Sequence, residues 1–276
     1  MLAAKSGVVC FIGAMNNNAP FSLICLNGHS GDFLWQKYSS SLGDILIEDG
    51  VYVTRSGMAG VARYGLDGSL SWSRPIRGPG IIYMFFVDEQ LQVFTALDKL
   101  ISIDPHNGET LFEFSNGHAV FIYTQDRYYV EDNGLQVIDS RTNTILWHRD
   151  LDDTLTLAPL FLDDRIYLRT GRTMGSIYAI DRTSGEVLWK TDDNIISNMA
   201  YSPSDLLVFC LTRDGYLLAI DRDSGQEFVL GEFSSVPFII NGEDDVGGYE
   251  LAFDDSTNML FVLLGDSRQL FAFQMK

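Results

Sequence analysis

Short apolar runs separated by polar turns continue along the whole chain, and each run is long enough for one strand but too short for a helix. Between Ala158 and Trp189, four such runs follow one another as APLFL, IYLRT, SIYAI and EVLW. The third and fourth runs flank a polar turn that begins with Asp181 and contains Gly185. This stretch therefore predicts four antiparallel strands joined by tight turns.

The same unit recurs along the chain with a period of about 40 residues. The aligned turns carry glycine, or asparagine in one copy, at positions 35–42 residues apart: Gly31, Gly68, Gly108, Asn143, Gly185 and Gly225. Four short strands per unit are typical of a β-propeller blade. We therefore expect an all-β, seven-bladed β-propeller of four-stranded antiparallel blades, forming a single domain over residues 1–276. The blades are predicted at residues 1–38, 43–75, 80–114, 118–150, 157–190, 198–230 and 248–276.

The last unit contains only three of the four strand signals and closes with RQLFAF. Residues 1–6 fit either the inner strand of the first blade or the outer strand of the last blade. Their pattern matches that of YELAFDDST in the last unit, which favours the inner strand of the first blade. The last blade is then three-stranded, with an open edge at which a peptide strand can add.

The polar turns have a structural explanation. An aspartate at the first position, such as Asp181 or Asp221, accepts backbone N–H bonds and starts a type I turn. The glycine four residues later, such as Gly185 or Gly225, tolerates the positive φ that a bulged hairpin needs. Asn143 replaces this glycine in one copy, and asparagine is the next most tolerant residue. We interpret these residues as determinants of the fold.

The sequence Ala-x-Asp-x-x-Ser-Gly-x-x-x-Trp at Ala179–Trp189 resembles the tryptophan-docking repeat of the PQQ-like (quinoprotein-like) β-propellers. The repeat assigns the tryptophans to packing between blades, and all four lie on the last strand of their units: Trp35, Trp72, Trp147 and Trp189. The resemblance to quinone-dependent members would imply adjacent cysteines and a further tryptophan in the central channel. This sequence has neither, so we expect no quinone cofactor and no PQQ-dependent dehydrogenase.

Charge and motifs do not indicate catalysis. A net charge of −18 opposes binding to nucleic acid and to anionic membranes. The four histidines lack metal-binding spacing, and no nucleophile or phosphate-loop motif is present, so we expect no catalytic residue. No signal peptide is visible and no apolar run approaches the ~20 residues that span a bilayer. A cytoplasmic location is the default expectation, and an excised extracytoplasmic domain is the alternative.

The three cysteines, Cys10, Cys25 and Cys210, all lie in apolar runs. Their odd number and the absence of CxxC spacing favour buried free thiols. Cys10 and Cys25 fall on neighbouring predicted strands, so a disulfide between them remains the alternative.

The main departure from the repeat is the connection at residues 231–248. Long loops in compact arrays are often functional, and the apolar centre of this one offers an anchor for a partner: Val236, Pro237, Phe238, Ile239 and Ile240. The same connection contains an acidic run of Glu243, Asp244 and Asp245. This run is more typical of solvated carboxylates than of a calcium site, so it is only a weak metal candidate. Four arginines from different blades are further partner-binding candidates: Arg55, Arg77, Arg172 and Arg213.

Every recurrent residue therefore has a structural explanation, and no residue cluster outside the repeat indicates catalysis. We expect a monomeric, non-catalytic scaffold for protein–protein interaction, either stand-alone or as a module of a larger assembly, with an unidentified protein partner and no cofactor. The alternative is a small-molecule-binding or hydrolytic propeller. If the strands of each blade are called A to D, its site would lie where the B–C and D–A connections surround the central channel.

Overall fold

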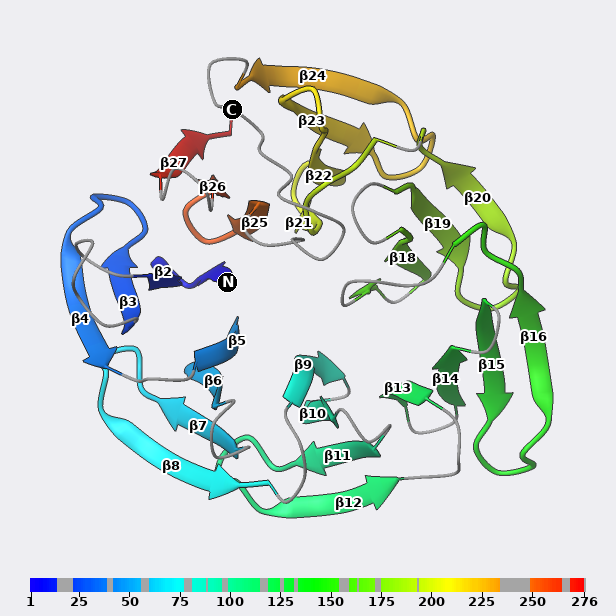
Figure 1. Cartoon of the computed structure of the whole chain (residues 1–276), viewed down its shortest axis with the longest axis horizontal. Coiled ribbons are helices and arrows are strands. Elements are labelled where there is room, and N and C mark those ends of the chain that lie inside the picture. Colours follow the sequence, from blue (N-terminus) through cyan, green and yellow to red (C-terminus); the bar gives the residue numbers. More distant parts are fainter. Residues whose placement is uncertain are drawn as a thin grey trace. The chain divides into compact units, whose positions relative to one another are not determined.

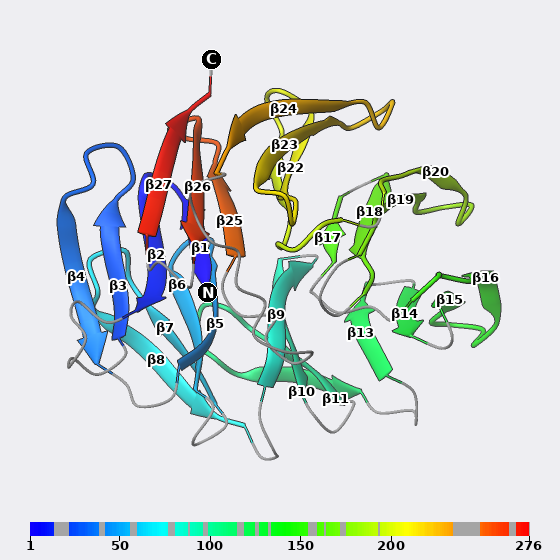
Figure 2. The ribbon, with the colours of Figure 1, turned by 45° about the horizontal axis from the view of Figure 1, so that its top comes forward.

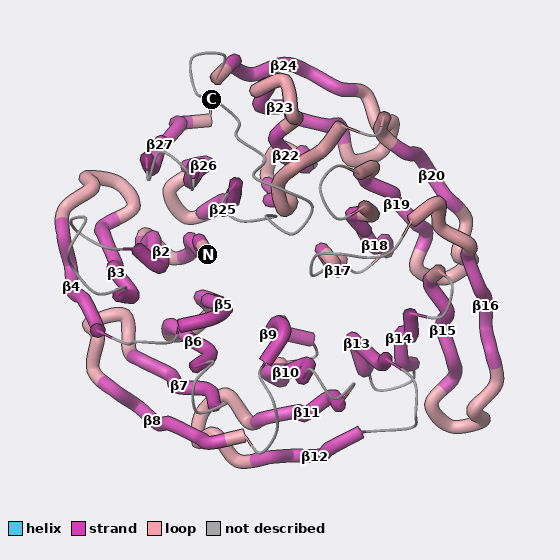
Figure 3. The backbone as a smooth tube through the Cα atoms, viewed as in Figure 1, coloured by secondary structure: helices cyan, strands magenta, loops and turns pink. Residues whose placement is uncertain are grey.

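The computed structural model describes residues 1–13, 22–38, 42–55, 60–76, 81–87, 89–95, 99–114, 119–124, 127–131, 134–153, 159–162, 164–171, 175–192, 194–233, 249–264 and 269–275. The described residues form strands joined by turns, without a helix among them (Figure 3). They belong to two compact units, an N-terminal unit of Met1–His148 and a C-terminal unit of Arg149–Lys276.

The N-terminal unit contains four antiparallel sheets (Figure 1). Sheet 1 comprises β1 (Leu2–Lys5), β2 (Val8–Gly13), β3 (Ser22–Asn27) and β4 (Phe33–Tyr38). Sheet 2 comprises β5 (Leu42–Ile47), β6 (Val51–Arg55), β7 (Gly60–Tyr64) and β8 (Leu70–Pro75). Sheet 3 comprises β9 (Ile81–Val87), β10 (Gln90–Thr95), β11 (Lys99–Ile103) and β12 (Thr110–Phe114). Sheet 4 comprises β13 (Ala119–Tyr123), β14 (Arg127–Glu131), β15 (Leu135–Asp139) and β16 (Ile145–Arg149), which reaches the boundary between the units.

Three antiparallel sheets make up the described part of the C-terminal unit. Sheet 5 comprises β17 (Leu160–Phe161), β18 (Arg165–Arg169), β19 (Ile177–Asp181) and β20 (Val187–Lys190). Sheet 6 comprises β21 (Ala200–Ser202), β22 (Leu207–Leu211), β23 (Tyr216–Asp221) and β24 (Glu227–Glu232). Sheet 7 comprises β25 (Tyr249–Asp254), β26 (Met259–Leu264) and β27 (Gln269–Gln274).

Within each sheet every strand pairs with the next one along the chain, as the repeat predicts. The N-terminal strand β1 pairs with β2, with Leu2 opposite Phe11, so the inner-strand role of residues 1–6 is confirmed. Figure 2 shows β2, β3 and β4 side by side in the same sheet.

The described residues form six four-stranded blades, whereas the general prediction was seven. The remaining sheet, sheet 7, has three strands with β27 at its edge, as the three strand signals of the last unit predicted. The predicted blade boundaries at the level of single residues stay predictions.

The hydrophobic cores lie between successive sheets. One core joins apolar residues of sheets 1 and 2, and another joins those of sheets 2 and 3. In the C-terminal unit, one core lies between sheets 5 and 6 and another between sheets 6 and 7. Each sheet in such a pair is covered on the face that meets its neighbour, which explains why the inner strands are almost continuously apolar in sequence.

The cysteine prediction is wrong for two of the three residues. Cys10 and Cys25 lie directly opposite each other on β2 and β3, with Cα atoms 4.1 Å apart, and they form a disulfide. Both residues are completely buried, and the direct cross-strand pairing brings their sulfur atoms together. Cys210 is a buried free thiol as expected, and burial raises its pKa. It therefore stays protonated at neutral pH and does not act as a nucleophile.

Candidate functional site

The tryptophan side chains dock on the turn of the following sheet. In three of the four tryptophans the indole N–H donates to a backbone carbonyl of that turn, which satisfies the one polar group of a largely apolar ring. The bonds run from Trp35 to Leu66 (2.7 Å), from Trp72 to Pro105 (2.8 Å) and from Trp189 to Arg222 (2.8 Å). These three tryptophans therefore pack one sheet against the next, as the repeat implies.

The turn glycines contribute more than a tolerance for positive φ. A Cβ atom at Gly68, Gly108 or Gly225 would lie 2.7–2.8 Å from an indole carbon of the docked tryptophan. The φ angles of these glycines are +71° to +81°, so both the backbone conformation and the close approach exclude larger residues. The first constraint was predicted from the sequence and the second was missed, although a tryptophan one unit upstream of each of these three glycines was visible in the repeat.

The turn aspartates are held by their own turns. The Oδ1 atom of Asp181 accepts hydrogen bonds from the backbone N–H groups of Thr183 and Ser184, at 2.9 and 2.7 Å. These bonds, led by that from the Ser184 backbone, lower the pKa of Asp181. At Asp221 the Ser224 hydroxyl is the leading cause of the lowered pKa. Both carboxylates are therefore ionised turn anchors, and neither is poised to act as a general base at neutral pH.

Replacing Asp181 and Asp221 by asparagine should weaken the dependence of stability on acid pH. Because the folded-state pKa values lie below the ordinary value of 3.8, the stabilisation is fully present above that value and is lost as the pH falls through the folded pKa. Thermal unfolding followed between pH 7 and pH 2.5 should show a shallower loss of Tm for the double variant than for the wild type. Equal slopes below pH 4 would contradict the assignment.

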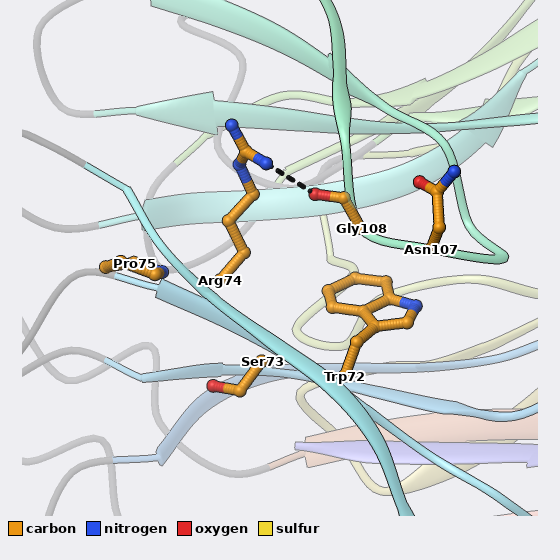
Figure 4. Close-up of a pocket in the computed structure, with 6 residues that line it drawn as sticks. All are labelled: Trp72, Ser73, Arg74, Pro75, Asn107 and Gly108. Carbon is orange, nitrogen blue, oxygen red and sulfur yellow. Dashed lines mark hydrogen bonds between the residues drawn. The ribbon is translucent and has the colours of Figure 1, made fainter.

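A polar groove lies beside the Trp72 dock (Figure 4). It has a volume of about 280 Å³ and is lined by Trp72, Ser73, Arg74, Pro75, Asn107 and Gly108. Arg74 reaches across it and donates from its guanidinium to the Gly108 carbonyl at 2.9 Å. The same arginine and Pro75 also line a neighbouring depression of about 450 Å³, together with Ile76, Lys99, Ile101, Thr110 and Glu113.

The groove can accept polar groups but has no catalytic arrangement. Lys99 and Glu113 form an ion pair at the wall of the neighbouring depression, and Arg74, which lines both, supplies a second cation. None of its lining residues is a histidine or a cysteine, so a nucleophile with an adjacent histidine base is absent from this groove. Lys99 begins β11 and Pro75 ends β8, so the depression lies at the B–C end of sheet 3 and the D–A end of sheet 2. The groove itself lies beside Asn107 and Gly108 in the C–D turn of sheet 3. Both are lined by third and fourth strands and the turn between them, away from the first strands that would face a channel.

Several of the strongly perturbed groups in the C-terminal unit belong to an ion-pair cluster. Arg165 and Arg222 both pair with Asp164, and Arg165 also lies 3.0 Å from Asp223. Burial raises the pKa of the neighbouring Tyr167 to about 12. The phenol therefore stays protonated, and the cluster neutralises turn carboxylates as a structural element.

The outer strand β24 carries a run of three exposed apolar residues. Phe228, Val229 and Leu230 are 43%, 63% and 44% exposed. Val229 occupies the repeat position of tryptophan, whereas Trp189 at that position in sheet 5 is only 9% exposed. The sequence showed the replacement of tryptophan by valine, but exposure of the whole run was missed because apolar strands were interpreted as buried.

Most of the predicted partner-binding and metal-binding residues lie outside the described residues. These are Val236, Pro237, Phe238, Ile239, Ile240, Glu243, Asp244, Asp245, Arg77 and Arg172. Arg55 lies at the end of β6 in the N-terminal unit and donates to the Tyr64 hydroxyl at 3.1 Å. Arg213 is exposed in the turn before β23 in the C-terminal unit. The partner-binding role of the four arginines stays a prediction.

No group of three or more histidine, cysteine or acidic side chains in the described ranges is arranged to hold a metal ion. No helix in the described part of the chain has the length and apolar character needed to cross a membrane.

Comparison with known proteins identifies the repeat and the fold. Residues 98–230 match the family model described as outer membrane protein assembly factor BamB, a PQQ-like repeat. The structure of BamB from Moraxella catarrhalis is similar, with a TM-score of 0.57 and 16% identity, over 100% of this chain and 91% of that one. The Cps50 (Swd1) β-propeller domain of Myceliophteria thermophila gives a TM-score of 0.72 at 10% identity, over 100% and 96% of the two chains. No curated protein matches the chain in sequence.

These likenesses establish the fold class. The chain has the all-β propeller fold built from four-stranded antiparallel blades, and its repeat is of the predicted PQQ-like type. At 10–16% identity, the solved structures show the fold alone.

Proposed function

Since residues 98–230 carry the PQQ-like repeat of the BamB family model, we propose that this chain is a non-catalytic propeller scaffold that binds another protein. The description of the family model, an outer membrane protein assembly factor, supports a role in a protein assembly. The turn aspartates, the ion pairs of Asp164 and the buried thiol of Cys210 support it too, because their shifted pKa values follow from a turn, an ion pair and a core.

The observation that carries the proposal is the exposed apolar run on β24. Isolated exposed apolar residues are ordinary on protein surfaces, but three consecutive ones on an outer strand are unusual. A partner would remove Phe228, Val229 and Leu230 from water, at about 25 cal/mol for each Å² of apolar surface buried. The apolar segment Val236–Ile240 follows β24 closely in sequence, so we propose that both contribute to one interface.

The disulfide favours one kind of cellular compartment for this protein. Cys10 and Cys25 pair directly across two strands of sheet 1. Structural disulfides persist in oxidising compartments and are rare where glutathione keeps thiols reduced. We therefore propose an extracytoplasmic site of action, which was the alternative in the sequence-based expectation.

The interface is tested by Val229→Glu. A charge at the centre of the run should abolish partner capture, because burying an unpaired carboxylate is strongly unfavourable. Its effect on folding should stay within about 0.5 kcal/mol, since Val229 is mostly exposed. Cross-linked affinity capture from the native source, with quantitative mass spectrometry, compares the proteins retained by the variant and by the wild type.

The matched control is Leu70→Glu on β8. Leu70 is 56% exposed on an equivalent outer strand, but its neighbours Ser69 and Ser71 are polar. The control should keep the proteins that Val229→Glu loses. Equal capture by both variants would remove β24 from the interface, and failure of the wild type to retain any specific protein would overturn the scaffold proposal.

A further inference from the structure

The turn that joins β3 and β4 has the geometry of the docked turns. Gly31 has a φ of +75°, and its N–H donates to the Asn27 carbonyl at 2.8 Å. The corresponding Gly108 has a φ of +76°, and its N–H donates to the Asp104 carbonyl at 2.9 Å. Asn27 also accepts two backbone N–H bonds through its side-chain oxygen, as the turn aspartates do. The backbone of this turn is therefore already shaped for a tryptophan.

The surface that an indole covers in other turns is uncovered at Gly31. Within the described part of the N-terminal unit, no heavy atom lies within 4 Å of the position of a Cβ on Gly31. At Gly68 and Gly108 in the same unit, indole carbons lie 2.7 and 2.8 Å from that position. Gly31 is accordingly exposed, whereas Gly68 and Gly108 are buried.

We propose that the Gly31 turn is a docking site for the indole of a tryptophan on an extended segment of a partner protein. The proposal rests on the scaffold function, because it specifies the chemistry of a protein ligand. Three of the four tryptophans of this chain already occupy internal docks, and Trp147 is only 8% exposed. The tryptophan for this turn therefore comes from another molecule.

The occupied docks specify how such a tryptophan would be held. Pro105 and Arg222, three residues before Gly108 and Gly225, accept the indole N–H bonds through their carbonyls. Gly28 stands three residues before Gly31, so its carbonyl is the corresponding acceptor. The ring would lie against the Cα of Gly31, where only glycine leaves room for it.

We expect the partner segment to carry a cation two residues after its tryptophan. Arg74, two residues after Trp72, donates to the carbonyl of the docked Gly108 at 2.9 Å (Figure 4). In the C-terminal unit, Arg149 likewise donates to the Gly185 carbonyl at 2.8 Å. Asp32 follows Gly31 directly, and the chain carries a net charge of −18, so a basic segment is electrostatically favoured. The expected ligand motif is Trp-x-Arg in an extended strand.

The test uses a peptide that copies Ser69–Ile76 (SLSWSRPI) of this chain. Titrated into the ¹⁵N-labelled full chain, it should shift the amide resonance of Gly31 by the ring current of the indole, with a Kd of about 1 mM. The peptide with alanine in place of tryptophan should not bind. The peptide with alanine in place of arginine should bind about tenfold more weakly, as expected for the loss of a charge-assisted hydrogen bond.

Gly31→Asn supplies a variant that blocks the dock and keeps the turn. Asn143 occupies the same turn position in sheet 4 with a φ of +55°, so asparagine fits this backbone while its side chain covers the docking surface. The variant should lose the peptide, whereas the exposed control His29→Ala should keep it. Unchanged binding to Gly31→Asn, or no shift at Gly31 with saturating peptide, would overturn the dock. Val229→Glu should bind the peptide normally, which separates this result from that of the β24 interface.

Discussion

Trp189→Ala should destabilise the protein by about 3–5 kcal/mol, the usual cost of truncating a large buried aromatic side chain. The indole is 9% exposed, it packs on Gly225, and its ring centroid lies 5.5 Å from that of Tyr167. The substitution removes these contacts and leaves the Arg222 carbonyl without the indole N–H. Urea unfolding, followed by far-UV circular dichroism, measures the loss.

Two further variants separate packing from hydrogen bonding at this dock. Trp189→Phe keeps an aromatic ring but removes the N–H donor, so it should cost about 1–3 kcal/mol. Leu188→Ala changes the preceding residue of the same strand, whose side chain is 43% exposed, and should cost less than about 1 kcal/mol. If Trp189→Ala were as mild as Leu188→Ala, the tryptophan would not hold sheets 5 and 6 together.

The docks explain why the fold was predictable from one sequence. In each unit the strands are apolar runs, most turns carry Asp and Gly, and four units carry a tryptophan on the last strand, and all of these are local signals. Asn143 confirms the logic, because it adopts a φ of +55° where the other copies use glycine. The repeat period therefore predicted the order of the sheets along the chain, and of the strands within each sheet, without information on distant contacts.

The strand number of sheet 7 was also predictable from local signals, because the three strand signals of the last unit correspond to β25, β26 and β27. The open surface at Gly31, in contrast, could not be predicted. Its turn sequence matches those of the occupied turns, and only the distances around each glycine distinguish a covered surface from an open one.

The candidate interface on β24 was missed for a related reason. Hydrophobicity of Phe228, Val229 and Leu230 predicts a strand, but it does not tell which face of that strand meets another sheet. In sheets 1 and 5 the tryptophan at the corresponding position covers the following turn. At Val229 the side chain is too short for that contact, and the apolar run is left on the surface. The proposed interface thus lies at a position where the repeat residue is replaced.

The second large effect is expected at the disulfide. Replacing Cys10 and Cys25 together by alanine should lower the free energy of unfolding by about 3 kcal/mol, the value for closing a loop of about 15 residues in the unfolded chain. Both side chains lie in the core between sheets 1 and 2, so lost packing adds to this effect. Tm should fall by roughly 6–12 °C at 2–4 °C per kcal/mol.

Reduction and alkylation identify the cause of that loss. Wild-type protein unfolded in dithiothreitol should approach the stability of the double variant, and the double variant itself should not respond to the reductant. Cys210→Ser should respond to dithiothreitol as the wild type does, because Cys210 is a free thiol buried in the core between sheets 5 and 6. Protein isolated from its native source and alkylated under denaturing conditions should carry one label, on Cys210. Three labels would show that Cys10 and Cys25 stay reduced there, and would place the protein in a reducing compartment.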